Sequence, residues 1–425
     1  MELELVSLRK SLQIHRGLVE VSGLINSITD YDELLRAVLD VARRVVRAEA
    51  ASLFLVDEEN GDLSLEISSS SEGQFAQPRI RVAPGQGIAG WVLEHGESLL
   101  IPDAYADERF FREADKASGF RTRSILCAPL CRSGTVIGVL QILNPKDKES
   151  FESEDLEGFE AYSNLIATAI EKLRAIDRIR EQERVSRDVS IAAEIQQELL
   201  SRAVPDRIPG GVFASYNKAA SDVGGDFFSV FPRSDGSVFF AISDVSGKGI
   251  PASLLMAQTL SAMQFVFASA NGPAEALATL NSTLHDHIVR GMFITTLIGR
   301  LLPETRTIEL ASAGHCRPWI VGPGNRATEI QTPGALPLGV LDDVAYEEET
   351  VTLAAREYLV SFTDGLSESR DGDTGQFFDD HLAKELQHDF PDPQSVVDHL
   401  VAVEKRYRGS EPARDDLTLL VGGFE

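Results

Sequence analysis

Two aspartates that flank a predicted hairpin are the first residues of this sequence whose spacing could support chemistry. Apolar runs at 227–231 and 238–242 lie on either side of the turn-forming residues 233–236, which is the pattern of a β-hairpin. Asp226 and Asp244 are equally distant from the middle of that turn, so we expect them to face each other across the two strands. Directly opposed carboxylates repel, and this pair therefore needs a cation or a shared proton; the alternative is an ordinary solvated hairpin end.

Two more aspartates lie at strand ends in the same half of the chain. Asp364 follows the predicted strand 358–362, and Asp415 comes shortly before the predicted strand 417–421. Carboxylates without His or Cys nearby favour Mg²⁺ or Mn²⁺ over zinc. If the four acids converge, two cations would balance their charge, and two cations can activate a bridging water for attack on phosphorus.

The elements around these acids predict a layered fold for the C-terminal half. Antiparallel strands are interleaved with two pairs of predicted helices, at 250–270 and 274–290 and at 377–389 and 394–407. This order fits an α/β/β/α sandwich better than a doubly wound parallel sheet.

The N-terminal half predicts a smaller α+β fold. An amphipathic helix is expected at 31–47, with Asp30 or Thr29 as its cap. Strands follow at 51–57 and 62–68, joined by a turn at Asn60-Gly61, so a second hairpin is expected here.

Residues 164–200 predict one long helix or two abutting helices between the halves. Apolar residues form one seam over 166–176 and another over 185–199, and the charged stretch 177–187 interrupts them. A narrow apolar stripe without internal Gly or Pro indicates either a parallel coiled coil in a homodimer or a solvent-exposed connector helix.

Charge and composition exclude several classes of partner. The formal net charge is −26 and no Lys/Arg-rich run is present, which argues against nucleic acid and against anionic membranes. The N-terminus lacks a signal-peptide pattern, and no stretch of 18 apolar residues is free of polar breaks. Three cysteines are too few for a disulfide framework. We therefore expect a cytoplasmic protein.

Residues 15–173 resemble the GAF domain, a small-molecule-sensing α+β fold. The resemblance rests on the order of elements and on the sequences GQGIAGWVLEHGESLLIPD and SILCAPL…VIGVLQILN. Members that bind cyclic nucleotides carry an Asn-Lys…Phe-x-x-x-Asp-Glu signature. Asn144, Phe151 and Asp155 match it, whereas Pro145 and Leu156 replace the expected Lys and Glu, so these residues are expected to hold the last strand against the last helix. An unknown small molecule, a redox signal or pure dimerisation remain open as inputs.

Residues 188–425 resemble the metal-dependent Ser/Thr phosphatases of the PPM class, in the bacterial SpoIIE/RsbU-type branch. Seven motifs occur in the family's order: VGGDFF, SDVSGKGIPASLLM, FITTLIGRLL, SAGHCRPWI, GALPLGV, FTDGLSES and RDDLTLLV. The preceding AAEIQQELL resembles the helix with which such domains begin.

This resemblance implies a role for each acid at a site with two Mn²⁺ or Mg²⁺ ions. Asp244 would bridge both metals, and the backbone carbonyl of Val245 would bind one of them. Asp364 and Asp415 would ligate the other, and Asp226 would contribute directly or through water. A metal-bound hydroxide would then be the nucleophile, with no phosphoenzyme intermediate.

Two other motif residues receive no catalytic role. Lys248 stands where many relatives have His in the glycine loop, and either binds phosphate or is an ordinary surface lysine. His315 in SAGH is expected to be structural. A diguanylate cyclase, whose loop resembles GGDFF, is excluded because Phe227 stands where that loop needs an acid.

The domain organisation expected is an N-terminal helix at 1–14, a GAF sensory domain at 15–173, a helical linker at 174–203 and a PPM phosphatase domain at 204–425. The reaction expected is hydrolysis of phosphoserine or phosphothreonine on a signalling partner. The resemblance implies a bacterial partner-switching pathway with a phosphorylated STAS-type anti-sigma-factor antagonist as substrate, regulated by the GAF domain. The alternative is a non-catalytic scaffold that binds the same partner.

Overall fold

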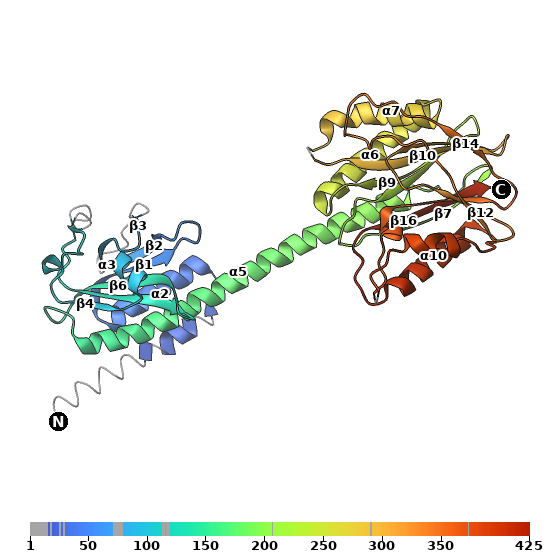
Figure 1. Cartoon of the computed structure of the whole chain (residues 1–425). Helices are drawn as coiled ribbons and strands as arrows, with labels where there is room; N and C mark the ends of the chain where they lie inside the picture. Colours follow the sequence, from blue (N-terminus) through green and yellow to red (C-terminus); the bar gives the residue numbers. More distant parts are fainter. Residues whose placement is uncertain are drawn as a thin grey trace. The chain divides into compact units, whose positions relative to one another are not determined.

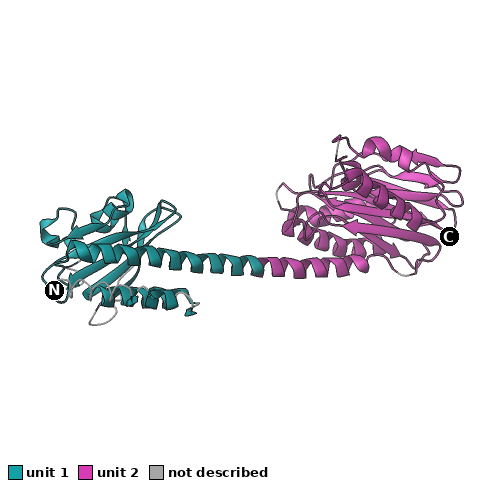
Figure 2. Cartoon of the chain, turned by 90° about the horizontal axis from the view of Figure 1, so that it is seen from below, with its two compact units in different colours: residues 1–183 teal, residues 184–425 magenta. Residues whose placement is uncertain are grey.

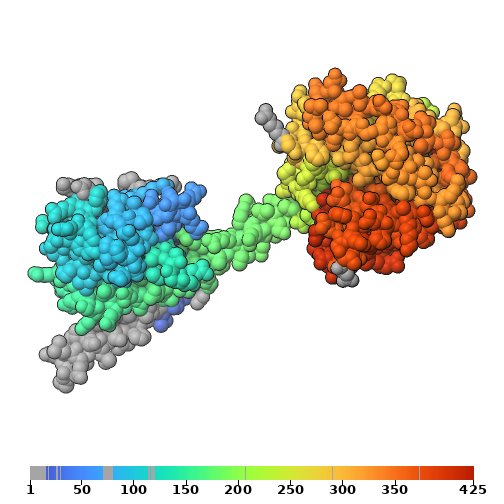
Figure 3. Space-filling model, viewed as in Figure 1, coloured from blue at the N-terminus to red at the C-terminus, as the bar shows by residue number. Residues whose placement is uncertain are grey.

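The computed structural model of the chain describes residues 16–17, 19–24, 27–28, 30–70, 80–112, 115, 120–205, 207–289, 291–372 and 374–425. The predicted N-terminal helix at 1–14 lies outside these residues. The chain divides into two compact units, residues 1–183 and residues 184–425 (Figure 2). The four domain ranges expected from the sequence stay a prediction. The space-filling view shows the packed surface of each unit (Figure 3).

Unit 1 is built on one antiparallel sheet with the strand order β3-β2-β1-β6-β5-β4 (Figure 1). Helix α2 (Tyr31–Val45) and the start of α5 pack on one face of this sheet, and α3 (Gly87–His95) packs on the other. The strands are β1 (Ala48–Val56), β2 (Leu63–Ser70), β3 (Arg81–Val82), β4 (Leu99–Ile101), β5 (Ile125–Arg132) and β6 (Thr135–Pro145).

The helix cap and the hairpin turn predicted for unit 1 are both present in the structure. The Asp30 carboxylate accepts the Glu33 backbone N–H at 2.8 Å and caps α2, which satisfies a donor that has no partner inside the helix. Strands β1 and β2 pair around the Asn60-Gly61 turn, with Leu53 opposite Ile67. The predicted second hairpin is confirmed.

Helix α5 (Ser153–Ser201) is a single element of 49 residues. Residues such as Ile166 and Ile170 are buried in unit 1, and Leu200 is buried in unit 2. The charged stretch 177–187 does not interrupt the helix, so the interpretation as two abutting helices is wrong. Several apolar side chains of its second half are exposed: Val185, Ile191, Ile195 and Leu199.

Unit 2 is a sandwich of two antiparallel five-stranded sheets. One sheet has the order β14-β11-β10-β9-β8 and the other β13-β12-β15-β16-β7. Their strands are β7 (Gly211–Lys218), β8 (Phe227–Pro232), β9 (Val238–Val245), β10 (Ile294–Leu302), β11 (Thr307–Ala313), β12 (Trp319–Gly322), β13 (Arg326–Glu329), β14 (Glu349–Thr352), β15 (Tyr358–Phe362) and β16 (Leu417–Phe424).

Helices cover the outer face of each sheet (Figure 1). Helices α6 (Ile250–Ser269) and α7 (Pro273–Leu284) pack on the first sheet, and α8 (Asp364–Ser367), α9 (Asp379–Glu385) and α10 (Pro393–Arg408) pack on the second. A third apolar core lies between the sheets and includes Phe240 and Leu420. The predicted α/β/β/α sandwich is thereby confirmed.

Helix α6 is long and apolar enough to cross a membrane by length and composition alone. Its buried residues pack against β8, β9 and α7. Within unit 2 it is therefore a core helix, which accounts for its apolar composition.

Candidate active site

The hairpin formed by β8 and β9 has the register predicted from the sequence. Phe227 pairs with Ser243 and Phe231 with Phe239, so the next positions outward bring Asp226 opposite Asp244. Asp226 and Asp244 thus face each other across the two strands, as expected.

Burial and neighbouring charge raise the pKa values of both carboxyl groups in this pair. Burial, followed by the charge of Asp244, raises the pKa of Asp226 well above its ordinary value. Burial, followed by the charge of Asp364, raises the pKa of Asp244 to about 7. Both shifts favour the protonated carboxyl group, because a charge removed from water and placed beside another of the same sign is destabilised.

The second sheet brings the other two predicted acids to the same place. Asp364 is the first residue of α8, directly after β15, and Asp415 lies two residues before β16. Burial, followed by the charge of Asp415, raises the pKa of Asp364. Both residues also act on Asp244 through their charge. The four aspartates therefore form one acidic cluster at the strand ends, with two members from each sheet.

Hydroxyl groups from the second sheet hold Asp226 in place. Thr363 Oγ1 donates to Asp226 Oδ2 at 2.5 Å, and the Thr418 side chain also bonds to this carboxyl group. The Thr363 hydroxyl in turn accepts the Thr418 backbone N–H at 3.1 Å. Asp226 is thus fixed to the ends of β15 and β16 in the second sheet.

Asp416 is a site residue to which the sequence analysis assigned no role. Its carboxylate accepts the backbone N–H groups of Ala220 at 2.8 Å, Gly225 at 2.7 Å and Asp226 at 3.4 Å. It therefore clamps the loop that carries Asp226 to the start of β16. Asp416 is the second acid of the RDD motif, and this position could have pointed to a role in the site. The backbone groups that it binds, however, are distant in the sequence.

Gln196 of α5 holds the same loop from the other side. Its side chain donates to the Gly224 carbonyl at 2.7 Å and accepts the Gly224 N–H at 3.1 Å. It is buried, although its neighbours on the helix are largely exposed. The helix that connects the two units therefore contacts the backbone two residues before Asp226.

Close backbone approach at two glycines brings the segments of the site together. An ideal Cβ on Gly365 would lie 1.8 Å from the Asp416 carbonyl oxygen, and one on Gly225 would lie 2.8 Å from the Val245 carbonyl oxygen. Only glycine allows such contacts. The Val245 carbonyl, a predicted metal ligand, is thus adjacent to the loop that carries Asp226.

Lys248 and His315 both lie near the cluster. Lys248 Nζ is 3.1 Å from Asp415 Oδ2 and donates to the Arg414 carbonyl, so it fastens the glycine loop to the segment before β16. His315 is buried and its Nδ1 is 2.9 Å from Thr295 Oγ1; Thr295 pairs with Asp244 between β10 and β9. Burial lowers the pKa of His315 to about 4, so its ring is neutral at pH 7.

The donor set of the cluster fits a divalent cation of the Mg²⁺ or Mn²⁺ kind. It consists of carboxylates and a backbone carbonyl, which are the oxygen ligands that these ions prefer. Burial and neighbouring carboxylates raise the pKa values of Asp226, Asp244 and Asp364, and a bound cation would favour the ionised form of each. Among the described residues, no group of three or more His, Cys, Asp or Glu side chains is already arranged to hold a metal ion. Metal binding would therefore have to draw the carboxylates together.

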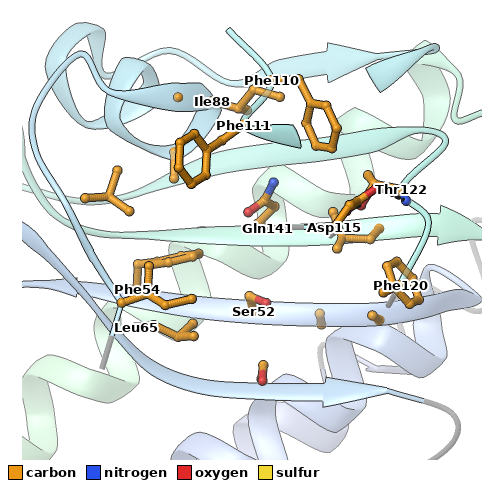
Figure 4. Close-up of a pocket in the computed structure, with 18 of the residues that line it drawn as sticks. Ser52, Phe54, Leu65, Ile88, Phe110, Phe111, Asp115, Phe120, Thr122 and Gln141 are labelled. Atoms are coloured by element: carbon orange, nitrogen blue, oxygen red, sulfur yellow. Dashed lines mark hydrogen bonds between the residues drawn. The ribbon is translucent and has the colours of Figure 1, made fainter. Parts of the chain in front are cut away.

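Unit 1 contains a separate cavity of about 260 Å³ between β1, β6, α3 and the segment before β5. Its wall is largely aromatic and aliphatic, and Ser52 and Gln141 point into it from the sheet (Figure 4). Asp115 is fixed at its edge, where it accepts the Thr122 backbone N–H at 2.8 Å and hydroxyl at 2.7 Å. The labelled apolar residues are Phe54, Leu65, Ile88, Phe110, Phe111 and Phe120.

The partial cyclic-nucleotide signature lies away from this cavity. Asn144, Phe151 and Asp155 are not among the described residues that line it. The Asn144 side chain instead bonds to the Arg121 carbonyl at 2.9 Å and accepts the Arg123 N–H at 2.6 Å. Asp155 pairs with Lys148. These contacts support the expected structural role of the signature.

Comparison with known proteins identifies a family for each part of the chain. Residues 234–424 match the family model of stage II sporulation protein E (SpoIIE), and residues 30–170 match that of the GAF domain. The SiaA-PP2C domain of Pseudomonas aeruginosa has a similar structure, with a TM-score of 0.52 at 21% identity over 58% of this chain and 99% of that one. At this identity the likeness shows the fold.

The curated relatives are much longer proteins. The chain is 33% identical over 186 residues to the probable 3',5'-cyclic phosphodiesterase pde-5 of Caenorhabditis elegans, covering 42% of this chain and 25% of that protein. It is 40% identical over 142 residues to the dual 3',5'-cyclic-AMP and -GMP phosphodiesterase 11 of Drosophila melanogaster, covering 30% and 10%. The chain thus spans a quarter or less of these two relatives. Residues 30–170 belong to the GAF domain family, and residues 234–424 belong to the SpoIIE-type phosphatase family.

Proposed function

We propose that this protein is a metal-dependent phosphatase that hydrolyses phosphoserine or phosphothreonine on a protein partner. The observation that carries the proposal is the acidic cluster, in which aspartates from the strand ends of both sheets act on one another through their charges and raise the pKa values of Asp226, Asp244 and Asp364. Folded proteins rarely retain buried like charges unless a cation or a reaction uses them.

Asp244, Val245, Asp364 and Asp415 would hold two Mn²⁺ or Mg²⁺ ions, with Asp226 contributing directly or through water. Such ions, when bound, lower the pKa of a coordinated water and orient it for attack on phosphorus. The chain's own residues prepare this arrangement. Thr363 and Thr418 orient the Asp226 carboxylate, and Asp416 fixes the backbone that carries it.

We assign regulation to unit 1 and to helix α5. The cavity in the GAF domain would receive a small molecule, and its occupancy would be passed on through the helix. Gln196 supports this route, because a rotation or shift of α5 would break its two bonds to Gly224. The exposed apolar side chains of α5 support a homodimer formed through this helix.

Deleting residues 1–183 is expected to change the activity, and Gln196→Leu is expected to lower it. Unchanged kinetics in both variants would contradict the coupling of unit 1 to the site through α5.

The substrate class follows from the SpoIIE-type family. We propose a phosphorylated STAS-type protein of a bacterial partner-switching pathway that controls a stress response. The primary assay is Mn²⁺-dependent phosphate release from such a protein by the full chain. Asp244→Asn should abolish release, whereas Asp343→Asn, which changes an exposed aspartate outside the cluster, should leave it unchanged. Equal rates for wild type and Asp244→Asn would refute the proposal.

A non-catalytic scaffold is the second candidate. It is favoured by the lack, within the described part of the chain, of a group of acids already arranged to hold a metal. The isolated residues 188–425 separate the two functions. Binding of the phosphorylated partner without phosphate release, by both the full chain and this fragment at saturating Mn²⁺, would support the scaffold.

A further inference from the structure

A groove in unit 2 begins at the acidic cluster and extends along α10. Its volume is about 600 Å³, which is within the range of ligand-binding clefts. Asp415 and Gly365 line one end, so the groove opens directly onto the proposed catalytic site. Other parts of its wall come from residues 368–372, 374, 375 and 377, the loop at 411–414 and α10.

Four cations line this groove without an ion-pair partner among the described residues. Lys218, Arg370, Lys405 and Arg414 are all exposed, and none of them forms a salt bridge in the described part of the chain. We call this set the basic groove. In a chain with a net charge of −26, this groove thus gathers four cations that are not engaged in salt bridges with any described residue.

Most acids of the groove already have a partner or a structural role. Glu404 is buried and accepts from Arg408 Nε at 2.7 Å and from Ser369 Oγ at 2.9 Å. Asp415 pairs with Lys248, and Asp371 accepts the Thr374 backbone N–H at 2.6 Å. A bond to a neutral N–H leaves the charge of Asp371 in place, so three lining acids, Glu368, Asp371 and Glu411, face the four cations. The four cations outnumber these acids and can contact a negatively charged segment.

We propose that the basic groove binds acidic residues that flank the phosphorylated residue of the protein substrate. This inference rests on the proposed phosphatase function and adds a sequence preference to it. With the phosphorylated side chain at the aspartate cluster, an extended substrate advances about 3.3 Å per residue, so residues two to four positions away reach the groove. Each exposed contact contributes little by itself. Four cations along one path, however, steer an acidic segment and fix its register.

The test uses two phosphoserine peptides and the full chain with Mn²⁺. The peptides are identical except that Glu at positions two to four on both sides of phosphoserine is replaced by Gln in the second. We expect kcat/KM to be about tenfold higher for the Glu peptide at low salt, mainly through a lower KM. The preference should fall in 0.5 M NaCl, because ions screen exposed charges.

Substitutions on α10 assign this preference to the groove. Lys405→Glu should reduce the ratio of kcat/KM between the two peptides to about 1, and Lys405→Gln should give an intermediate ratio. Arg406→Glu is the matched control, because Arg406 is the adjacent exposed cation on the same helix and does not line the groove. It should retain the wild-type ratio. Using a ratio removes any general loss of activity from the comparison.

Three results would overturn the inference. Equal kcat/KM for both peptides in the wild type would show that the groove does not select acidic residues. A loss of preference in Arg406→Glu as large as in Lys405→Glu would indicate net charge rather than the groove. Hydrolysis of p-nitrophenyl phosphate distinguishes failure of the inference from failure of the proposed function. If the Mn²⁺-loaded wild type hydrolyses this compound but treats both peptides equally, the inference alone fails. If it does not hydrolyse this compound, both fail.

Discussion

Replacing Asp416 by alanine should destabilise unit 2 strongly, although this residue is not a predicted metal ligand. The substitution leaves the N–H groups of Ala220 and Gly225 without their acceptor, and both bonds are short, at 2.8 and 2.7 Å. The third bond, from Asp226 at 3.4 Å, contributes less. Each hydrogen bond to a charged group stabilises by about 1.5–3 kcal/mol, so losing the two short bonds should cost about 3–6 kcal/mol.

Asp415→Ala is the control, because it removes the neighbouring carboxylate. The Asp415 side chain is 45% exposed and pairs with Lys248, which is also exposed. Such a surface ion pair contributes about 0–1 kcal/mol. Asp415→Ala should therefore abolish phosphatase activity with little loss of stability, whereas Asp416→Ala should reduce both.

Differential scanning calorimetry in EDTA measures the difference. For a unit of this size, 1 kcal/mol lowers Tm by about 2–4 °C, so Asp416→Ala should lower the Tm of unit 2 by roughly 10 °C. The transition of unit 1 serves as an internal reference. If the Tm of unit 2 is the same in both variants and the wild type, the N–H groups have other acceptors and the argument for the clamp is wrong.

Two further predictions concern the charge and the packing of the site. The pKa of Asp244 rises from 3.8 to about 7 on folding, so the folded state holds the extra proton and the metal-free protein should lose stability between about pH 4 and pH 7. Asp244→Asn should reduce this loss, which urea unfolding at pH 5 and pH 8 in EDTA would measure; an equal loss in both proteins would contradict the assignment. Gly365→Ala should lower stability by about 1–3 kcal/mol and abolish activity, because its Cβ would meet the Asp416 backbone. Gly334→Ala, which meets nothing within 4 Å, should change neither, and normal activity of Gly365→Ala would refute the close approach.

The sequence predicted the hairpin that carries Asp226 and Asp244 because a short turn fixes the register of the strands that it joins. Counting outward from the turn was sufficient to place the two acids opposite each other. The layered fold was also predictable, since the order and length of apolar segments restrict how helices can cover antiparallel strands. Asp364 and Asp415 could be expected near the pair only through their positions at strand ends and the family resemblance.

The contacts that organise the site could not be predicted in the same way. Asp416 and Gln196 bind main-chain groups of the loop before Asp226, and a main-chain partner leaves no mark in the sequence. The continuity of α5 through residues 177–187 was also undecided, because a charged stretch interrupts an apolar seam without breaking a helix. Whether the backbone continues as a helix depends on the helix propensity of its residues, and not on the continuity of the apolar seam.

Because the aspartates are divided between the two sheets, the distances among their carboxyl groups depend on how the sheets are aligned. Asp226 and Asp244 move with one sheet, and Asp364 and Asp415 move with the other. A small sliding of one layer over the other would thus alter cation affinity without any change in the ligands themselves. By thermodynamic reciprocity, a bound cation would favour one alignment of the layers. An effector could then control catalysis from the interior between the sheets, at a distance from every reacting atom.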